Sequence, residues 1–347
     1  MFGEYQVEII PASDKRGLAE VEKFLATFDL SFERELEYTV AVRLGDKLVG
    51  TGSFLGEVLR NVAVDESLQG SGLTALILSQ LMQEQARKGR MHYFIFTKPS
   101  TAPLFVNLGF REIVRAEPHV ALLESGLGSI DSYCASVAKL VAYLPEQRAA
   151  VVVNCNPFTK GHQGLIRKTA SENDGVIVFV VSEDKSLFPF ETRMKLVREG
   201  LADLPNVVVV PTGKYIISSA TFPTYFTRDE NKITAQTRLD VTLFASQIAP
   251  QLGITARYIG EEPYCSVTDA YNQAMEEIFP QYGIDLKIMK RLQVDEAIVS
   301  ASKVRDLIRC GDWDSIRTLV PETTLVYLKS AEAQPIIEKI QHSTSRH

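Results

Sequence analysis

One stretch in the middle of the chain constrains its fold more than any other. Residues 149–153 read Ala-Ala-Val-Val-Val, a short apolar run that is typical of a strand buried on both faces of a parallel sheet. Pro157 ends the strand, because the residue before a proline is kept out of the helical region. Gly161 allows a close approach of the backbone, and apolar residues recur at helical spacing from His162 onward. The pattern predicts a strand, a short polar turn and a helix.

A turn of this kind favours anions. It places backbone N–H groups at the carboxyl edge of a sheet, where the positive end of the helix dipole attracts negative charge. His162 adds a further donor at the helix entry. The turn has neither the Walker pattern G-x-x-x-x-G-K-[ST] nor the dinucleotide pattern G-x-G-x-x-G. We therefore expect an anion site of another type, although an ordinary turn beside an exposed histidine would give the same pattern.

The bulk properties allow two ordinary domains and exclude several classes of protein. The chain has 347 residues, of which 45% are hydrophobic and 23% charged, and a net charge of -6 without a basic block. We therefore expect no nucleic-acid partner, and no apolar run is long enough to predict a membrane partner. Four cysteines without C-x-x-C spacing give no zinc pattern, so we expect no metal ligands. With no signal peptide apparent, the sequence predicts a reduced, cytoplasmic protein of enzyme size.

The first 125 residues predict an α/β domain. A turn with the sequence Gln69-x-x-Gly72-x-Thr74 follows a strand and opens an apolar-faced helix. Glycines at such a position let backbone N–H groups face a pyrophosphate. Helices are expected at 15–27, from 74 onward and at 102–109, and strands at 5–10, 38–44, 47–54, 59–64, 92–97, 110–115 and 118–123.

This turn resembles the pyrophosphate-binding turn of the GNAT acyltransferases, and Leu108-Gly109-Phe110 resembles a later motif of that family. The family usually has glycine or alanine where this chain has Thr74, whose branched side chain would crowd the phosphates. The alternative is a GNAT scaffold that only docks a partner protein. The resemblance implies a coenzyme A-type or pantetheine ligand bound by Val62, Val64, Gln69, Gly70, Ser71, Gly72 and Thr74.

The rest of the chain predicts a connecting helix and linker at 126–147 and a second domain at 148–347. Strands alternate with helices, which predicts a Rossmann-like parallel sheet with right-handed crossovers. The expected strands are 149–154, 175–181, 206–211, 256–260 and 284–289. The expected helices are 162–173, 190–201, 232–249 and 270–278, with a further helix that begins after Ser300.

That last helix carries a second candidate anion site. Ser300 is the expected N-cap, and Ser302 adds another hydroxyl group at the helix start. Lys303 and Arg305 follow one turn in, where they suit the β- and γ-phosphates of a nucleotide. An ordinary capped helix with solvated Lys303 and Arg305 is the alternative.

Both candidate sites resemble signatures of the nucleotidyltransferase superfamily. Thr159-Lys160-Gly161-His162 resembles H-x-G-H in the variant that begins with threonine, and residues 299–305 resemble I-S-S-T-x-[IV]-R. The resemblance implies ATP with Mg²⁺ across its phosphates. His162, Lys160 and Arg305 would be catalytic, with His162 on the α-phosphate and Arg305 on the leaving pyrophosphate. The implied ATP-binding residues are Asn154, Asn156, Pro157, Phe158, Thr159, Gly161, His162, Ser300, Ser302, Lys303 and Arg305.

The order of the two domains, with residues 217–226 (Ile-Ser-Ser-Ala-Thr-Phe-Pro-Thr-Tyr-Phe), resembles the citrate lyase ligase family over essentially the whole chain. That resemblance implies that acetate and ATP give acetyl-adenylate and pyrophosphate. The acetyl group would then pass to the thiol of a dephospho-coenzyme A-type group on the citrate lyase acyl carrier subunit. One alternative is a phosphopantetheine adenylyltransferase-like enzyme, which would not need the N-terminal domain. Another is a non-catalytic sensor of ATP and acyl-coenzyme A.

Two further features remain open at this stage. Cys155 follows a buried strand with no obvious base nearby, so we expect it to pack in the core rather than act as a nucleophile. Glu261 and Glu262 follow a strand and would contact adenine or ribose, or else lie on the surface as ordinary carboxylates.

Overall fold

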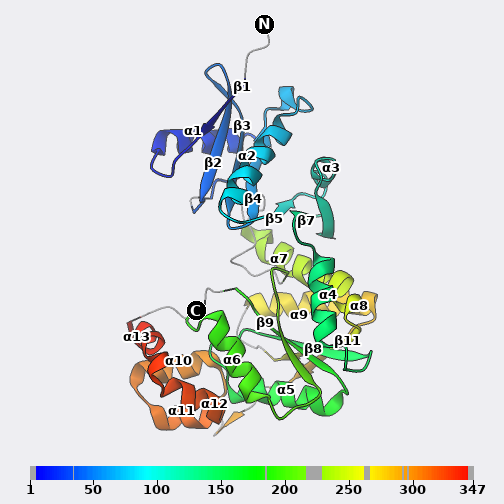
Figure 1. The fold of residues 1–347 in the computed structure, drawn as a ribbon, viewed down its shortest axis with the longest axis vertical. Coiled ribbons are helices and arrows are strands. Elements are labelled where there is room, and N and C mark those ends of the chain that lie inside the picture. Colours follow the sequence, from blue (N-terminus) through cyan, green and yellow to red (C-terminus); the bar gives the residue numbers. More distant parts are fainter. Residues whose placement is uncertain are drawn as a thin grey trace. The chain divides into compact units, whose positions relative to one another are not determined.

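The computed structural model describes residues 5–33, 35–183, 186–215, 229–261, 266–290, 293–294 and 297–342 (Figure 1). They form two compact units, which are described separately. The first unit comprises the described residues within Met1–Ser132 and Ser219–Leu243, and the second unit those within Tyr133–Ser218 and Phe244–His347. Each unit is therefore built from two separate segments of the chain. The domain boundaries expected at residues 125 and 147 remain predictions.

The first unit is built on a seven-stranded sheet with the order β1-β2-β3-β4-β5-β7-β6. Every neighbouring pair is antiparallel except β4 and β5, which run parallel. The strands are β1 (Tyr5–Ile9), β2 (Tyr38–Leu44), β3 (Lys47–Leu55), β4 (Val58–Val64), β5 (His92–Thr97), β6 (Arg111–Ala116) and β7 (Val120–Gly126).

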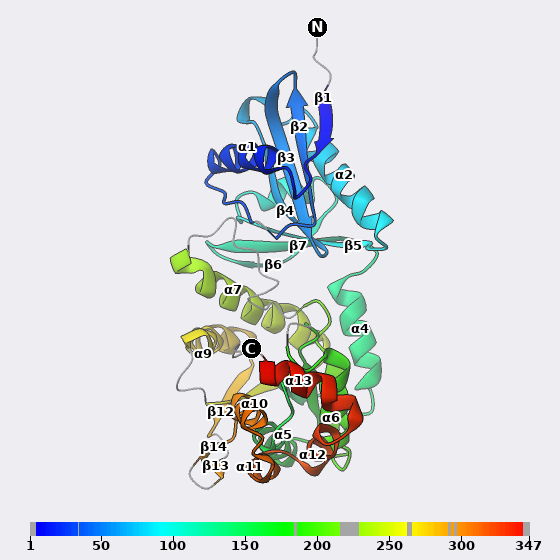
Figure 2. The same ribbon diagram turned by 90° about the vertical axis from the view of Figure 1, so that its left-hand side faces the viewer.

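Successive side chains of a strand point to opposite faces of the sheet, and in this sheet apolar side chains are buried on both faces. Val40 and Val42 of β2 belong to the apolar cluster of helix α2 (Leu73–Arg87), whereas Ala41 between them belongs to the cluster of helix α1 (Lys15–Ala26). The two helices accordingly lie on opposite faces of the sheet (Figure 2). Two more helices complete the unit: α3 (Ala102–Val106), and α7 (Asp229–Leu243), which lies against β6 and β7.

Strands β4 and β5 diverge soon after they meet. They pair only at Val58 with Phe94 and at Leu59 with Ile95. An extra residue in β4 then forms a β-bulge opposite β3, where Asn61 has a positive φ of 54°. Among the described strands, none pairs with residues 60–64 of β4 on the β5 side. This splayed parallel pair, followed by a glycine turn and a helix, confirms the GNAT-like fold expected from the sequence.

The second unit contains a five-stranded parallel sheet with the order β10-β9-β8-β11-β12. The chain moves outward from β8 on one side and then starts again on the other side with β11. Ligands of α/β sheets bind at the carboxyl edge where the order reverses in this way. The expected Rossmann-like parallel sheet is confirmed. Its strands are β8 (Arg148–Val153), β9 (Val176–Val180), β10 (Val207–Pro211), β11 (Ile254–Gly260) and β12 (Asp285–Met289), and β13 (Gln293–Val294) and β14 (Ala297–Ile298) form a separate hairpin.

Helices surround this sheet, and α10 to α13 gather at one side of it (orange to red in Figure 1). Among the described helices, none combines the length and the apolar surface that a bilayer crossing requires. The helices with residues in this unit are α4 (Ile130–Leu140), α5 (Lys160–Glu172), α6 (Phe190–Gly200), a π-helical turn (Phe244–Ile248), α8 (Ala249–Gln251), α9 (Ser266–Ile278), α10 (Ala301–Cys310), α11 (Trp313–Leu319), α12 (Glu322–Leu328) and α13 (Gln334–His342).

Candidate functional site

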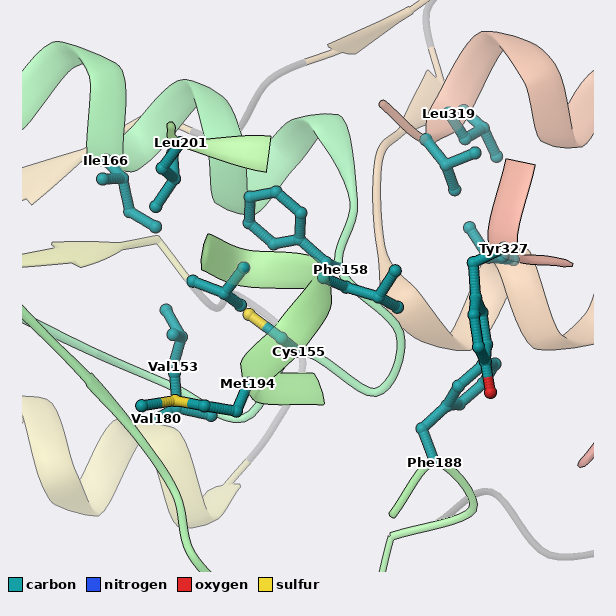
Figure 3. Packing of buried hydrophobic residues seen from close by; sticks show 14 of the residues in the cluster. Val153, Cys155, Phe158, Ile166, Val180, Phe188, Met194, Leu201, Leu319 and Tyr327 are labelled. Atoms are coloured by element: carbon teal, nitrogen blue, oxygen red, sulfur yellow. The ribbon is translucent and has the colours of Figure 1, made fainter. Parts of the chain in front are cut away.

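The turn that follows β8 places two of its side chains in the hydrophobic core of the second unit. Cys155 and Phe158 lie among apolar side chains of α5, α6 and α12, including Ile166, Met194 and Tyr327 (Figure 3). Burial raises the pKa of the Cys155 thiol far above its ordinary value, so the side chain stays protonated and inert. The expectation that Cys155 packs in the core is confirmed.

Helix α5 begins with a reciprocal cap that uses the threonine and the histidine of the first signature. Thr159 is the N-cap, and its Oγ1 accepts a hydrogen bond from the backbone N–H of His162 at 3.4 Å. The Nδ1 atom of His162 accepts in return from the backbone N–H of Thr159 at 3.2 Å. A capping box normally uses Glu or Gln at this third position. Because Nδ1 accepts a hydrogen bond, the neutral ring carries its proton on Nε2, which makes Nε2–H a donor suited to a phosphate oxygen.

Lys160 is the first residue of α5, and its ammonium group reaches another helix. The Nζ atom donates to the carbonyl oxygens of Arg317 at 3.2 Å and Thr318 at 2.9 Å, at the C-terminal end of α11. A cation is favoured there because the helix dipole places partial negative charge at that end. The catalytic role expected for Lys160 remains a prediction.

The second signature begins helix α10 as expected. Ser300 is its N-cap and accepts from the backbone N–H of Lys303 at 3.2 Å. Ser302 and Lys303 are exposed, whereas Arg305 is only 4% exposed. Burial, and after it the charge of Arg309, lowers the pKa of Arg305 below its ordinary value. The guanidinium remains a cation at neutral pH, because the ordinary value is far above it.

The two signatures, far apart in the sequence, meet in the structure. Arg305 donates from Nη1 to the carbonyl oxygen of Asn156 at 2.6 Å and from Nη2 to Ser302 Oγ at 3.2 Å. The backbone of Val299 also lies directly against Gly161, where an added Cβ would stand 2.9 Å from the Val299 carbonyl oxygen. The starts of α5 and α10 are therefore adjacent. Two helix N-termini together make a stronger anion site than one.

One residue that supports this site was missed from the sequence. Arg193 of α6 has no exposed surface, and its guanidinium donates to the carbonyl oxygens of Asn154, which follows β8, and of Val181, which follows β9. Its position gave a signal, because Val197 and Gly200 lie four and seven residues after it on the buried face of the same helix. A charged side chain in line with that face has to find partners in the interior.

The glycine turn of the first unit is held differently. Gly70 and Gly72 have positive φ angles of 80° and 87°, and Gly72 is the N-cap of α2 without a side-chain hydrogen bond. Gln69, Gly70, Ser71 and Gly72 are exposed, Val62 and Thr74 are half-buried, and Val64 is buried. The binding roles of all these residues remain predictions.

Other residues singled out from the sequence do not contribute to the described site. Residues 217–226 and Glu262 lie outside the described residues, and exposed Glu261 donates its backbone N–H to the carbonyl oxygen of Met289 at 2.9 Å. In the described part of the chain, no three His, Cys, Asp or Glu side chains are grouped so that they could hold a metal ion.

Comparisons with known proteins cover nearly the whole chain. The family model of the citrate lyase ligase C-terminal domain matches residues 148–328. The [citrate [pro-3S]-lyase] ligase of Klebsiella pneumoniae is 36% identical over 320 residues, which cover 91% of this chain and 93% of that protein. The protein of the same name from Escherichia coli K12 is 35% identical over 336 residues, or 95% of each chain. A phosphopantetheine adenylyltransferase of Pasteurella multocida is 44% identical over 57 residues, which cover 16% of this chain and 36% of that one.

Solved structures also align with parts of the chain, at low identity. A GNAT-family acetyltransferase of Staphylococcus aureus Mu50 aligns with a TM-score of 0.31 and 14% identity, and the alignment covers 35% of this chain and all of that one (100%). Thermotoga maritima TmcAL bound with alpha-thio ATP aligns with a TM-score of 0.36 and 14% identity, over 55% of this chain and 57% of that one.

The fold and the site define a two-part class of protein, in which a GNAT-like α/β unit shares one chain with a nucleotidyltransferase-type unit. The full-length matches narrow this class further. The chain belongs to the citrate lyase ligase family.

Proposed function

We propose that the chain activates citrate lyase by ATP-dependent acetylation. Acetate and ATP would form acetyl-adenylate and pyrophosphate on the second unit. The sulfur of the prosthetic-group thiol on the acyl carrier subunit would then attack the acetyl carbonyl carbon, and AMP would leave. The observation that carries the proposal is the junction of Asn156 and Gly161 with Arg305 and Val299, which joins the two helix starts that carry the signatures. The names and lengths of the matching relatives support the same activity.

The geometry suggests a role for each residue of the first step. The Nε2–H of His162 would donate to the α-phosphate as negative charge develops on it, which is the kind of stabilisation that accelerates such reactions most. Arg305, which the fold already holds rigidly through Asn156 and Ser302, would fix the leaving pyrophosphate with Ser300. Lys160 and Thr159 would line the turn beside them.

Mg²⁺ would enter as the complex of ATP. Magnesium in such sites is bound through substrate phosphates and few protein groups. Among the described residues, no three His, Cys, Asp or Glu side chains are grouped so that they could hold a metal ion, and we assign no step to a metal held by the chain.

The first unit would present the thiol. Residues 60–64 of β4, which pair with no described strand on the β5 side, would offer backbone hydrogen bonds to an extended pantetheine arm. The turn at Gly70 and Gly72 would offer N–H groups to a pyrophosphate. A phosphopantetheine adenylyltransferase activity is not favoured, because those enzymes match 16% of the chain and the ligases more than 90%.

The test is acetate-dependent exchange of labelled pyrophosphate into ATP. We expect the wild-type chain to catalyse it, and His162→Ala to lower its rate by about 10² or more, as expected for loss of a preorganised donor. His342→Ala, which removes an exposed histidine of α13, serves as the matched control. An unchanged rate in a folded His162→Ala variant would exclude His162 from the mechanism.

A further inference from the structure

Arg193 is the largest side chain that the second unit buries completely. Its guanidinium has five N–H donors in a rigid plane. The Nε atom donates to the carbonyl oxygen of Phe188 at 2.9 Å, and Nη2 donates to that of Glu183 at 2.7 Å. The Nη1 atom reaches the carbonyl oxygen of Val181 at 2.7 Å, and the carbonyl oxygen and Oδ1 of Asn154 at 3.0 Å and 2.9 Å.

Two of these partners, Asn154 and Val181, lie where neighbouring strands end. Asn154 follows β8 and Val181 follows β9, so both carbonyl groups lie beyond the last paired residues of the two parallel strands. Buried carbonyl groups in native proteins are nearly always hydrogen-bonded. Arg193 therefore continues the connection between the two strands beyond the point where the sheet stops.

The same contacts fix the turn that leads to the first signature. Cys155, next to Asn154, has a positive φ of 55°, which a residue with a side chain adopts only when its surroundings hold it there. Asn156 follows, and its Oδ1 accepts from the backbone N–H of Phe188 at 3.1 Å. Its carbonyl oxygen accepts from Arg305. Arg193 and Arg305 thus hold the turn from its two ends.

We infer that Arg193 is a positioning residue for adenylate formation, which holds residues 154–156 in the one conformation that brings His162 and Arg305 to the same phosphate chain. The inference rests on the proposed function. Lysine cannot replace arginine here, because a single ammonium nitrogen cannot reach oxygens that now bond to three different nitrogens. The geometry of the guanidinium, and not only its charge, is what the turn requires.

The experiment compares Arg193→Ala and Arg193→Lys with Arg198→Ala, which removes an exposed arginine from the same helix. We expect both Arg193 variants to lose about 10²-fold in kcat for acetate-dependent exchange, because small displacements of catalytic groups cost this much, with a smaller change in the KM for ATP. Millimolar guanidinium chloride should restore part of the rate of Arg193→Ala and none of that of His162→Ala. Control-level exchange in Arg193→Ala, or full activity in Arg193→Lys, would overturn the inference.

A second measurement is independent of catalysis. If Arg193 holds the turn, its loss should open Cys155 to alkylation, read by peptide mapping, while wild type and Arg198→Ala keep Cys155 protected. Continued protection of Cys155 in both Arg193 variants would also overturn the inference. Absence of exchange in the wild-type chain would instead contradict the proposed function and leave the labelling result to decide on Arg193.

Discussion

Two of the turns that lead from a strand into a helix carry the candidate anion sites, and they are stabilised by different means. In the first unit, Gly70 and Gly72 adopt positive φ angles, and an added Cβ at either would meet nothing within 4 Å. In the second unit, Gly161 has ordinary backbone angles but no room for a Cβ. Glycine is thus needed for its conformation in one turn and for its size in the other.

This difference indicates what each turn can do. The first offers backbone N–H groups without a side-chain cap, which suits recognition of a phosphate group that does not react. The second is held by side chains, through the cap of Thr159 with His162 and the bonds from Arg193 and Arg305. Chemistry at a phosphorus atom needs such fixed donors, because preorganisation is the source of their effect.

The largest effect is expected for Gly161→Ala. The new Cβ would stand 2.9 Å from the carbonyl oxygen of Val299, so α5 and α10 must move apart. We expect exchange activity to fall by about 10² or more, since the proposed catalytic groups lie on both helices. Gly260→Ala is the control, because its Cβ would meet nothing within 4 Å. Equal activity of the two variants would show that the close approach is not required.

Gly72→Ala should give a smaller and more selective effect. Forcing a non-glycine residue to a φ of 87° costs about 1–2 kcal/mol of stability. Acetyl transfer to the carrier thiol should fall, as it should in Gln69→Ala, while pyrophosphate exchange survives. Gly89→Ala, at the other end of α2 with a φ of 77° and equal space, should lose similar stability and keep transfer. If exchange and transfer fell together in folded Gly72→Ala, the two turns would not divide the reaction.

The smallest effect concerns Cys155. Burial keeps the pKa of its thiol raised, so it should remain a thiol as the pH rises through about 8.5, where an ordinary cysteine ionises. Iodoacetamide at mildly alkaline pH should therefore label the exposed Cys310 and spare Cys155, with mass spectrometry as the readout. Rapid labelling of Cys155 in the folded wild type would show that the second turn opens readily.

Local signals predicted most of the second unit. The strand at β8 and the N-cap at Ser300 each depend on a few neighbouring residues, and the structure confirms both. The cap at Thr159 was not predicted, because the helix was expected to begin at His162. Sequence reasoning placed the two signatures at one site only through a resemblance. The bond from Arg305 to Asn156 is a long-range contact that no local pattern encodes.

Other features could not be predicted for the same reason. The bonds from Lys160 to the end of α11 join residues more than 150 positions apart, and propensity carries no information about them. A helix was expected near α7, but nothing in its residues indicates which of the two sheets it covers. That choice depends on tertiary packing.

Helix α7 has a consequence for synthesis of the chain. Its residues, Asp229–Leu243, follow β10 in the sequence, yet they cover β6 and β7 of the first unit. Domains normally fold in order as they leave the ribosome. Here the first unit cannot be completed until α7 has been translated. Splitting the gene at any single position between β7 and α7 would therefore give an N-terminal fragment in which β6 and β7 lack this helix.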